Sequence, residues 1–495
     1  MSTIMAAELM VADRWGLRSK AVAGLGQRLQ GYWSRYRGCF KTKTRDSAKH
    51  AWDYLRGLLE MKAERNFANI ARRLTGPEQD GQNLQQFMSD SPWAAQAVTR
   101  QVQQEIASTP GLQQGGVLLL DESADEKAGF QSAGACLRRQ AGRQYNGRLG
   151  KVELSQVGVF LAFYKEGLWT WVDGELFLPK HWFTPEMKQE RRRLGVPQER
   201  QFATKVELGW QMIQRVQSNG LPFEVVACDD LYGRSGWLRQ QMGRAKLLYM
   251  AEVPEDTQVY LTKPDWGVPA PTPGQVGRWP TRSQVLSADQ PLEARQVISL
   301  PDTHFQRFVV RNTERGELDD PFAMRRIWTM RAGELAEEWL VIRYESAQRY
   351  TYALSNAPAK TPPQRLAQLK CVRHFVERAH QDAKSETGWD ELQAQKYRAW
   401  EHHLALTIMA TWFIAQTKYD WSNTYARDPQ LVQQLELKTL PALSVANVRE
   451  LLQAAMPLPQ LSPDQATQLV IQHLVNRSRS TRSRHKSHHN RRSQT

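Results

Sequence analysis

The stretch Val117-Leu118-Leu119-Leu120-Asp121 is the starting point for predicting the fold. Four consecutive apolar residues that stop at a carboxylate are typical of a short β-strand buried on both faces. Phe223–Cys228 is a second apolar run of this kind, and it ends at Asp229-Asp230. Ligands and catalytic groups of α/β proteins gather at the carboxyl ends of such strands. If the two runs are neighbouring strands, Asp121 and Asp229 emerge at the same edge of one sheet.

The segments around these two runs alternate between strand and helix. Strands are predicted at Gln156–Tyr164 and Leu168–Phe177, and Lys165-Glu166-Gly167 between them favours a hairpin. The remaining predicted elements are helices at Phe202–Val216 and Gly236–Met242 and a strand at Leu247–Val253. Three strands, helix, strand, helix, strand is the order of a ribonuclease-H-like fold, whose first and fourth strands are neighbours. We therefore expect an α/β catalytic core of that kind.

Other regions flank and interrupt the predicted core. Residues 1–110 have helical patterns that suit either a DNA-binding region or a packing domain, and the sequence does not separate the two. The core is expected at 111–254 and again at 359–425, on either side of a β-rich insertion at 255–358. The insertion is predicted from its early prolines and glycines and from strand-like runs at Phe305–Val310, Arg325–Met330, Trp339–Tyr344 and Tyr350–Leu354. A helical region at 426–475 and a basic, disordered tail at 476–495 complete the chain.

A predicted helix in the second part of the core carries charged and apolar residues on separate faces. Thr361-Pro362-Pro363 suits its cap and first turn, and Gly388 predicts its end after about Thr387. At 100° per residue, one stripe of the helix holds Arg373, Glu377, His380 and Lys384. The other side is apolar and is predicted to pack, through Val372, Phe375, Val376, Ala379 and Ala383.

Glu377 on this stripe has two interpretations. In isolation, a glutamate among basic residues is more often part of a solvated salt-bridge stripe. Asp121 and Asp229 also have an ordinary alternative, because acids that follow strands often cap helices or lie in loops. Together, two strand-end aspartates and a helical glutamate indicate a site with three carboxylates. His380 receives no role from the sequence.

Three such carboxylates suit two divalent cations about 4 Å apart, which promote in-line displacement at a phosphodiester. Hard carboxylate oxygens favour Mg²⁺, with Mn²⁺ as the alternative. Arg373 and Lys384 would face the phosphates of the substrate. Several basic and aromatic residues lie near the first aspartate in the sequence: Lys127, Arg143, Tyr145 and Lys151. They would either bind DNA or simply keep a loop exposed to solvent.

The charge of the chain points to the same class of partner. The net charge is +15 and the pI is about 9.7, which favours a polyanion such as double-stranded DNA. The four cysteines have no paired spacing, so neither a zinc site nor a disulfide framework is predicted. Leu404–Ala415, the longest apolar run, is too short to span a bilayer, and no signal peptide is recognised. We expect a cytoplasmic protein without a membrane partner.

At this point the sequence resembles a known family, the DDE transposases of bacterial insertion sequences, and within it the insertion-sequence seven-hundred-and-one group. The resemblance covers about residues 40–420. Its first block is Leu119-Leu120-Asp121-Glu122-Ser123, Lys127-Ala128-Gly129, Arg143-Gln144-Tyr145, Gly147, Gly150-Lys151-Val152 and Gln156-Val157-Gly158-Val159. Its later motifs are Asp229-Asp230-Leu231-Tyr232-Gly233-Arg234, Asn356-Ala357-Pro358, Glu377 with Lys384, Gly388, and His402-His403-Leu404.

The resemblance implies a transposase in which Asp121, Asp229 and Glu377 hold the metals. The Arg373, Glu377 and Lys384 spacing is also similar to the Tyr-Arg-Glu-Lys signature of related cut-and-paste enzymes with a β-rich insertion. Lys370 stands where those enzymes have the tyrosine, so it would keep a phosphate-binding capacity without the aromatic stack. Two departures are an inserted segment at Leu137–Gly142 and an unusually acidic stretch after Asp121, formed by Glu122, Asp125 and Glu126.

The sequence thus predicts a transposase that cuts the ends of a DNA element by Mg²⁺-dependent hydrolysis and joins them to target DNA. A homodimer is expected in the DNA complex, because transposition joins two ends. A hairpin on the flanking DNA is possible by analogy with the related enzymes. Two alternatives stay open: a transposase descendant that binds DNA without cutting it, and a ribonuclease-H-like nuclease that cuts without joining.

Overall fold

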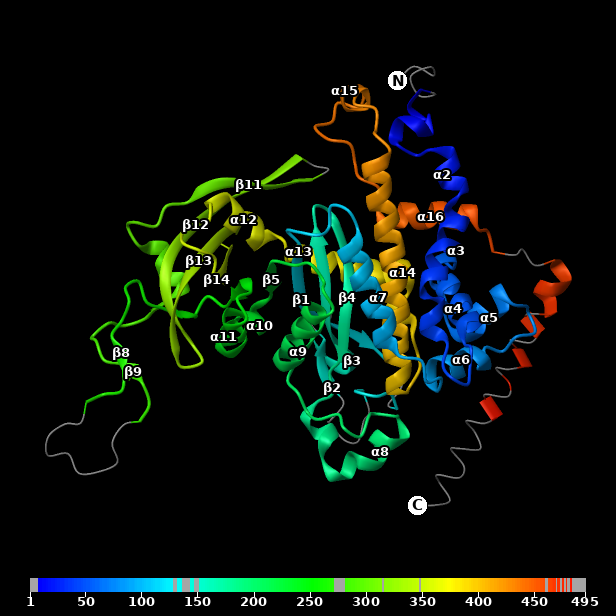
Figure 1. Cartoon of the computed structure of the whole chain (residues 1–495), viewed down its shortest axis with the longest axis horizontal. Helices are drawn as coiled ribbons and strands as arrows, with labels where there is room; N and C mark the ends of the chain where they lie inside the picture. The colour runs from blue at the N-terminus through cyan, green and yellow to red at the C-terminus, as the bar shows by residue number, and fades with distance from the viewer. Residues whose placement is uncertain are drawn as a thin grey trace.

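One large mixed β-sheet runs through the protein and helices pack on it, so the fold is mixed α/β (Figure 1). The computed structural model describes residues 8–127, 131–135, 143–146, 151–270, 281–313, 316–346, 349–458 and parts of 462–482, with the backbone only for 143–146, 151–154 and 316. Among these residues the strand order is β11-β12-β13-β14-β6-β5-β1-β3-β2, and β4 pairs with β3. The strands are β1 (Val117–Glu126), β2 (Arg143–Asn146), β3 (Lys151–Lys165), β4 (Leu168–Leu176), β5 (Val225–Cys228), β6 (Leu248–Val253), β11 (Gln306–Thr313), β12 (Gly316–Arg331), β13 (Glu334–Ser346) and β14 (Arg349–Ser355).

The two apolar runs that end in aspartates are neighbouring parallel strands, as predicted. β1 pairs with β5 from Val117↔Val225 to Leu120↔Cys228. The predicted end of the first strand is wrong, however, because β1 continues through Asp121 to Glu126. Its antiparallel partner β3 is longer than β5 and accompanies β1 along its whole length, so the backbone beyond Leu120 still has a partner. Asp121 therefore lies where the parallel pairing stops, and not where the strand stops.

The β-rich segment continues the core sheet. The four runs predicted as its strands fall within β11–β14, and β14 pairs antiparallel with β6. The side chain of Asn356 strengthens this junction, since it accepts a hydrogen bond from the Tyr249 amide and donates one to the Leu247 carbonyl, both at 2.9 Å. Smaller ladders join β7 (Gln258–Val259) to β10 (Leu292–Glu293) and β8 (Trp266–Gly267) to β9 (Gln284–Val285). The predicted insertion thus interrupts the core in the sequence, but its strands β11–β14 belong to the same sheet as the core strands.

The predicted helical N-terminal region is confirmed for the described part of residues 1–110. Its helices are α2 (Ser19–Ala23), α3 (Leu25–Tyr36), α4 (Ala48–Glu60), α5 (Phe67–Leu74), α6 (Gln82–Ser89) and α7 (Ala95–Ser108). The long helix α14 (Tyr397–Thr424) contacts β4 and α7 on one side and α4 on the other (Figure 1). This explains the apolar run Leu404–Ala415, which is almost fully buried inside the protein. None of the described helices is both long and apolar enough to cross a membrane.

The helix that carries Glu377 is divided in two. The sequence predicted one helix from about residue 361 to Thr387, but α12 (Pro363–Cys371) and α13 (His374–Thr387) are separate. α12 packs on β6, β11 and β13, whereas α13 packs on β1, β3 and β4, so the chain changes direction between them. The predicted end is confirmed, because Gly388 has φ +68° and its amide reaches back to the last turn of α13.

The remaining α-helices are α8 (Lys188–Arg193), α9 (Lys205–Ser218), α10 (Asp230–Gly233), α11 (Gly236–Arg244), α15 (Gln430–Gln434) and α16 (Val445–Ala455). The predicted helices at 202–216 and 236–242 correspond to α9 and α11. The inserted segment Leu137–Gly142 lies outside the described residues, and so does almost all of the basic tail predicted at 476–495. The boundaries proposed for the domains stay predictions.

Candidate active site

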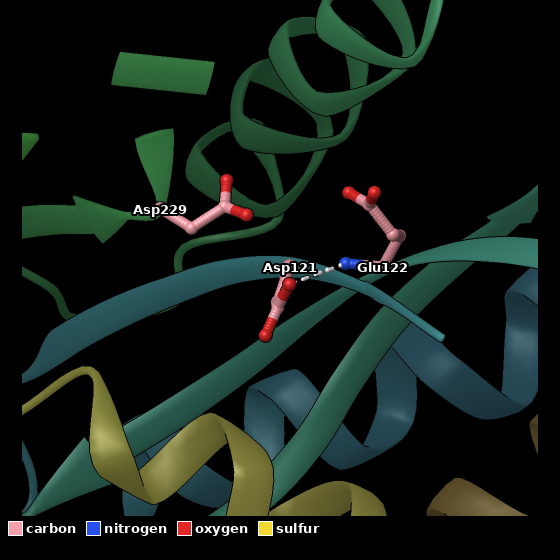
Figure 2. A group of neighbouring side chains, drawn as sticks. All are labelled: Asp121, Glu122 and Asp229. Atoms are coloured by element: carbon pink, nitrogen blue, oxygen red, sulfur yellow. Dashed lines mark hydrogen bonds between the residues drawn. The ribbon is translucent and has the colours of Figure 1, made fainter. Parts of the chain in front are cut away.

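Asp121 and Asp229 come together where β1 and β5 stop pairing (Figure 2). Asp229 directly follows β5 and caps α10, since its Oδ1 accepts hydrogen bonds from the amides of Leu231 at 3.1 Å and Tyr232 at 3.4 Å. The ordinary interpretation of Asp229 as a helix cap is therefore correct, but it does not exclude a second role. Asp121, Asp229 and Glu122 each offer one oxygen atom that lies within 4.8 Å of the others.

Glu122 is the member of this group that the sequence did not single out as a ligand. Successive residues of a strand point to opposite faces, and Figure 2 shows the side chains of Asp121 and Glu122 on opposite sides of β1. Glu122 forms an ion pair with Lys205 of α9 at 3.0 Å, and its amide donates to Asp121 Oδ1 at 2.8 Å. Glu122 could have been identified from the sequence because it directly follows Asp121, at the position where the parallel pairing of β1 ends.

The electrostatics of the pair favour a bound cation. Burial, followed by the nearby charge of Asp229, raises the pKa of Asp121 well above its ordinary value, and Arg373 only partly opposes this. Burial and then the charge of Glu122 raise the pKa of Asp229 to about 7. The negative charge at this point is therefore incompletely compensated by the protein itself. Oxygen ligands with excess negative charge are what a hard divalent cation requires.

Arg373 is the cation at the centre of the site. Its guanidinium lies 3.5 Å from Asp121 Oδ2, 3.0 Å from Glu252 Oε2 and 2.8 Å from Glu377 Oε1. Burial opposes the charge of Arg373, but these carboxylates more than offset it and raise its pKa. Arg373 thus links strands β1 and β6 to α13. The sequence predicted it as a DNA contact, but in this structure its guanidinium already pairs with three carboxylates of the protein.

Glu377, the third predicted carboxylate, lies beside the aspartates without joining them. Its side chain is 54% exposed and is held by Arg373, one turn earlier on the chain. Among the described residues, the compact carboxylate group contains Glu122 and not Glu377. The structure therefore brings Asp121 and Asp229 together as predicted, and it connects Glu377 to Asp121 through Arg373.

The lysines predicted as DNA contacts face inward. Lys370 is 3% exposed and its ammonium lies 2.5 Å from Glu252 Oε1. Lys127 is also buried, donates to the Leu392 carbonyl at 2.7 Å, and has a pKa lowered by burial. Lys384 pairs with Asp125 at 2.8 Å. Burial and internal partners speak against direct phosphate contacts by these three side chains in this conformation.

Two other predicted contacts, Arg143 and Tyr145, lie on β2, whose backbone pairs with β3. Their side chains are outside the described part of the chain. The same is true of Lys151, which the sequence also placed near the first aspartate. These contacts stay predictions.

His380 belongs to the site although the sequence assigned it no role. The indole N–H of Trp171 donates to His380 Nδ1 at 3.2 Å, and His380 Nε2 lies 3.9 Å from Asp121 Oδ2. Burial, then the charges of Lys384 and Arg373, lower the pKa of His380 to about 3. His380 is therefore a neutral ring against the candidate metal ligand. Only the packing of α13 on β1 and β4 reveals this.

The histidine motif His402-His403 serves packing. His402 stacks on Trp93 at 3.7 Å between ring centroids, and His403 stacks on Trp389 at 4.9 Å. His403 also hydrogen-bonds the Tyr54 hydroxyl at 2.9 Å and the Trp389 carbonyl at 3.0 Å. Both rings are buried and hold α14 against its neighbours.

The chain is similar in sequence to known proteins. The family described as "DDE superfamily endonuclease" matches residues 35–317, which is more than half of the chain. The match contains Asp121 and Asp229 and ends before Glu377. A protein of Microchaete diplosiphon named "Probable transposase for insertion sequence element IS701" is 28% identical over 155 residues, which cover 31% of this chain and 36% of that protein. The chain thus matches only about a third of the length of this relative.

Proposed function

This chain belongs to the DDE superfamily endonucleases, and from that premise we propose that it is an insertion-sequence DNA transposase. It cleaves the ends of its element and joins them to target DNA by metal-dependent phosphodiester hydrolysis and strand transfer. The observation that carries the proposal is the pair formed by the buried Asp121 and the partly buried Asp229, where the adjacent parallel strands β1 and β5 stop pairing. The likeness to a protein named as a probable transposase supports the choice of transposition over other endonuclease reactions.

We assign the core to the ribonuclease-H-like class. The supporting observation is the strand order β4-β3-β1-β5-β6, in which the first three strands of the core are antiparallel and the last two are parallel to β1. The neighbourhood of β1 and β5 agrees with the predicted neighbourhood of the first and fourth strands, and it brings the two aspartates close together. β11–β14 then extend the same sheet at the β6 side.

The proposed cofactor is Mg²⁺, with Mn²⁺ as a substitute. Asp121 and Asp229 would hold it, because their carboxylates are close together and incompletely neutralised. We propose Glu377 as the third ligand, since it shares Arg373 with Asp121. Glu122 competes for this role from the other face of β1. When bound, the metals would activate the attacking water or 3′-hydroxyl and stabilise the leaving oxygen.

The residues of the chain orient this site. Arg373 holds Glu377 and Asp121 in one network and neutralises part of their charge. Glu252 anchors Arg373 from β6, and Lys370 in turn pairs with Glu252. The proposed partner is double-stranded DNA, which the net charge of +15 favours. We propose that the protein acts as a homodimer on the DNA, at the nucleoid in the cytoplasm of a bacterium.

One assay tests the function and separates the alternatives. The protein is incubated with labelled DNA that carries the inverted repeats flanking its gene, a supercoiled target plasmid and Mg²⁺, with and without EDTA. Joined products support a transposase, cleavage without joining indicates a nuclease, and a mobility shift without cleavage indicates a DNA-binding descendant.

Variants of the carboxylates test the site in the same assay. Asp229→Asn and Glu377→Gln are expected to abolish both steps, while Asp230→Asn serves as the matched control. Asp230 is the next residue, and its exposed carboxylate pairs with Arg234 at 3.0 Å. Glu122→Gln decides the competition: if it abolishes cleavage and Glu377→Gln does not, Glu122 is the third ligand and the assignment of Glu377 is wrong.

A further inference from the structure

The face of β1 that looks toward α13 carries two acidic side chains. Asp121 and Asp125 are four residues apart on one strand, so they point to the same side. α13 matches them with cations at its two ends. Arg373, at the start of the helix, lies 3.5 Å from Asp121, and Lys384, in its last turn, lies 2.8 Å from Asp125. The helix and the strand are thus joined by charge pairs at two separated points.

The pair at the C-terminal end of α13 is the more deeply buried of the two. The side chains of Lys384 and Asp125 are 12% and 3% exposed. Lys384 Nζ also donates a hydrogen bond to the Ala124 carbonyl at 3.2 Å, so it contacts two groups of β1. The other oxygen of the Asp125 carboxylate accepts a hydrogen bond, at 2.5 Å, from the indole N–H of Trp389, just beyond the helix.

Trp389 makes this arrangement rigid. Its ring is buried and stacks on His403 of α14. Asp125 is therefore contacted by Lys384 from inside α13 and by Trp389 from just beyond its end. The Trp389 ring is held in place by its packing in the core. A slip of α13 along β1 would break the Lys384 contact and leave the buried Asp125 carboxylate with the charge of Lys127 alone to offset it.

We propose that Lys384 and Asp125 are positioning residues, whose buried pair sets the register of α13 against β1 and thereby holds Arg373 and Glu377 at the aspartates. Lys384 then acts through Asp125 and not as a DNA contact, in contrast to the expectation from the sequence. The effect of this pair on DNA cleavage rests on the proposed function. The pair itself can be tested without catalysis.

The test is a double-mutant cycle with Lys384→Met, Asp125→Asn and the double variant, in the full-length protein. Arg378→Met is the matched control, because it removes one positive charge from a partly buried position of the same helix whose hydrogen bond goes to Gln381 and not to β1. We expect each single variant to lower the melting temperature, and the double variant to lose clearly less than the sum of the two. Arg378→Met should leave the melting temperature unchanged.

DNA binding distinguishes positioning from phosphate contact. Affinity for a labelled duplex of mixed sequence is measured by fluorescence anisotropy over a series of salt concentrations. Loss of a phosphate contact reduces the slope of log K against log salt by about 0.9. We expect Lys384→Met to leave this slope unchanged. At saturating DNA its cleavage rate should fall at least tenfold with an unchanged KM, and Asp125→Asn added to it should restore part of the rate.

A readout independent of catalysis keeps the inference separate from the proposed function. Titration with Mn²⁺ by calorimetry is expected to show weaker binding in Lys384→Met than in wild type, and no change in Arg378→Met. If wild type binds Mn²⁺ but does not cut DNA, the proposed function fails, while the thermal cycle and the Mn²⁺ titration still decide this inference. A reduced salt slope in Lys384→Met, or melting-temperature losses that simply add, would overturn it.

Discussion

Replacing Asp229 with asparagine should stabilise the metal-free protein at the expense of its activity. Burial and the charge of Glu122 raise the pKa of Asp229 from 3.8 to about 7, so the folded protein binds this proton more tightly than the unfolded chain does. Its stability therefore falls as the pH rises from about 4 through about 7. Asparagine removes the charge and still caps α10, because it is as good an N-cap as aspartate.

The magnitude follows from the interval between the two pKa values. At about 1.4 kcal/mol per unit, the full shift corresponds to an upper limit of about 4 kcal/mol above pH 7. Asp229 is only partly buried, and water screens some of the repulsion, so we expect a gain of about 2 kcal/mol. At pH 5 most of the folded protein already carries the proton, and the gain should be less than half of its value at pH 8.

Urea denaturation in EDTA at pH 5 and pH 8 measures this gain. Asp230→Asn is the control: its carboxylate is exposed, is paired with Arg234 and is the last of the causes that raise the pKa of Asp229, so its gain that depends on pH should be much smaller. Excess Mn²⁺ should reverse the order, because it stabilises the wild type by binding to the folded state and has lost a ligand in the variant. An Asp229→Asn variant that is no more stable than wild type at pH 8, or equally stabilised at both pH values, would refute the reasoning.

Three further predictions concern packing, pH and the sheet junction. A Cβ atom at Gly233 would lie 1.8 Å from the Glu252 carbonyl oxygen, so Gly233→Ala should lower the free energy of unfolding, measured with urea, by about 3 kcal/mol. Gly31→Ala is the control and should not lower it, because the space around Gly31 is open. Equal effects of the two substitutions would contradict the close approach at Gly233. Burial lowers the pKa of His402 to about 4, so wild-type stability is lost as the pH falls below about 6.5. The stability of His402→Phe relative to wild type should therefore rise by about 2 kcal/mol between pH 7.5 and pH 5, and a constant difference would show that the ring is not neutral in the folded state. Asn356→Ala removes both hydrogen bonds to the start of β6 and should cost about 2 kcal/mol, with faster amide exchange in β14; unchanged exchange there would mean that strand pairing alone secures the junction.

Much of the fold follows from local patterns. The apolar runs at 117–120 and 223–228 were identified as strands because they are short, continuous and bounded by polar residues, and they pair as expected. The end of β1 could not be predicted, because it depends on the length of its partner β3. The break between α12 and α13 was missed for a similar reason: each half packs on different strands, and no residue at the junction breaks a helix.

The sequence is enough to predict that Asp121 and Asp229 meet, because each follows a short apolar run, and these two runs do pair as parallel strands although β1 continues past Asp121. It also determined the apolar face of α13, whose period is a local property. Only the tertiary structure decided what the cations do. Lys370 pairs with Glu252, 118 residues earlier in the chain, and Lys384 pairs with Asp125 on β1. A lysine that faces solvent and one that is buried against a distant carboxylate have the same local sequence signature, because the energy of a charge depends on the partners and the solvent that the fold brings to it.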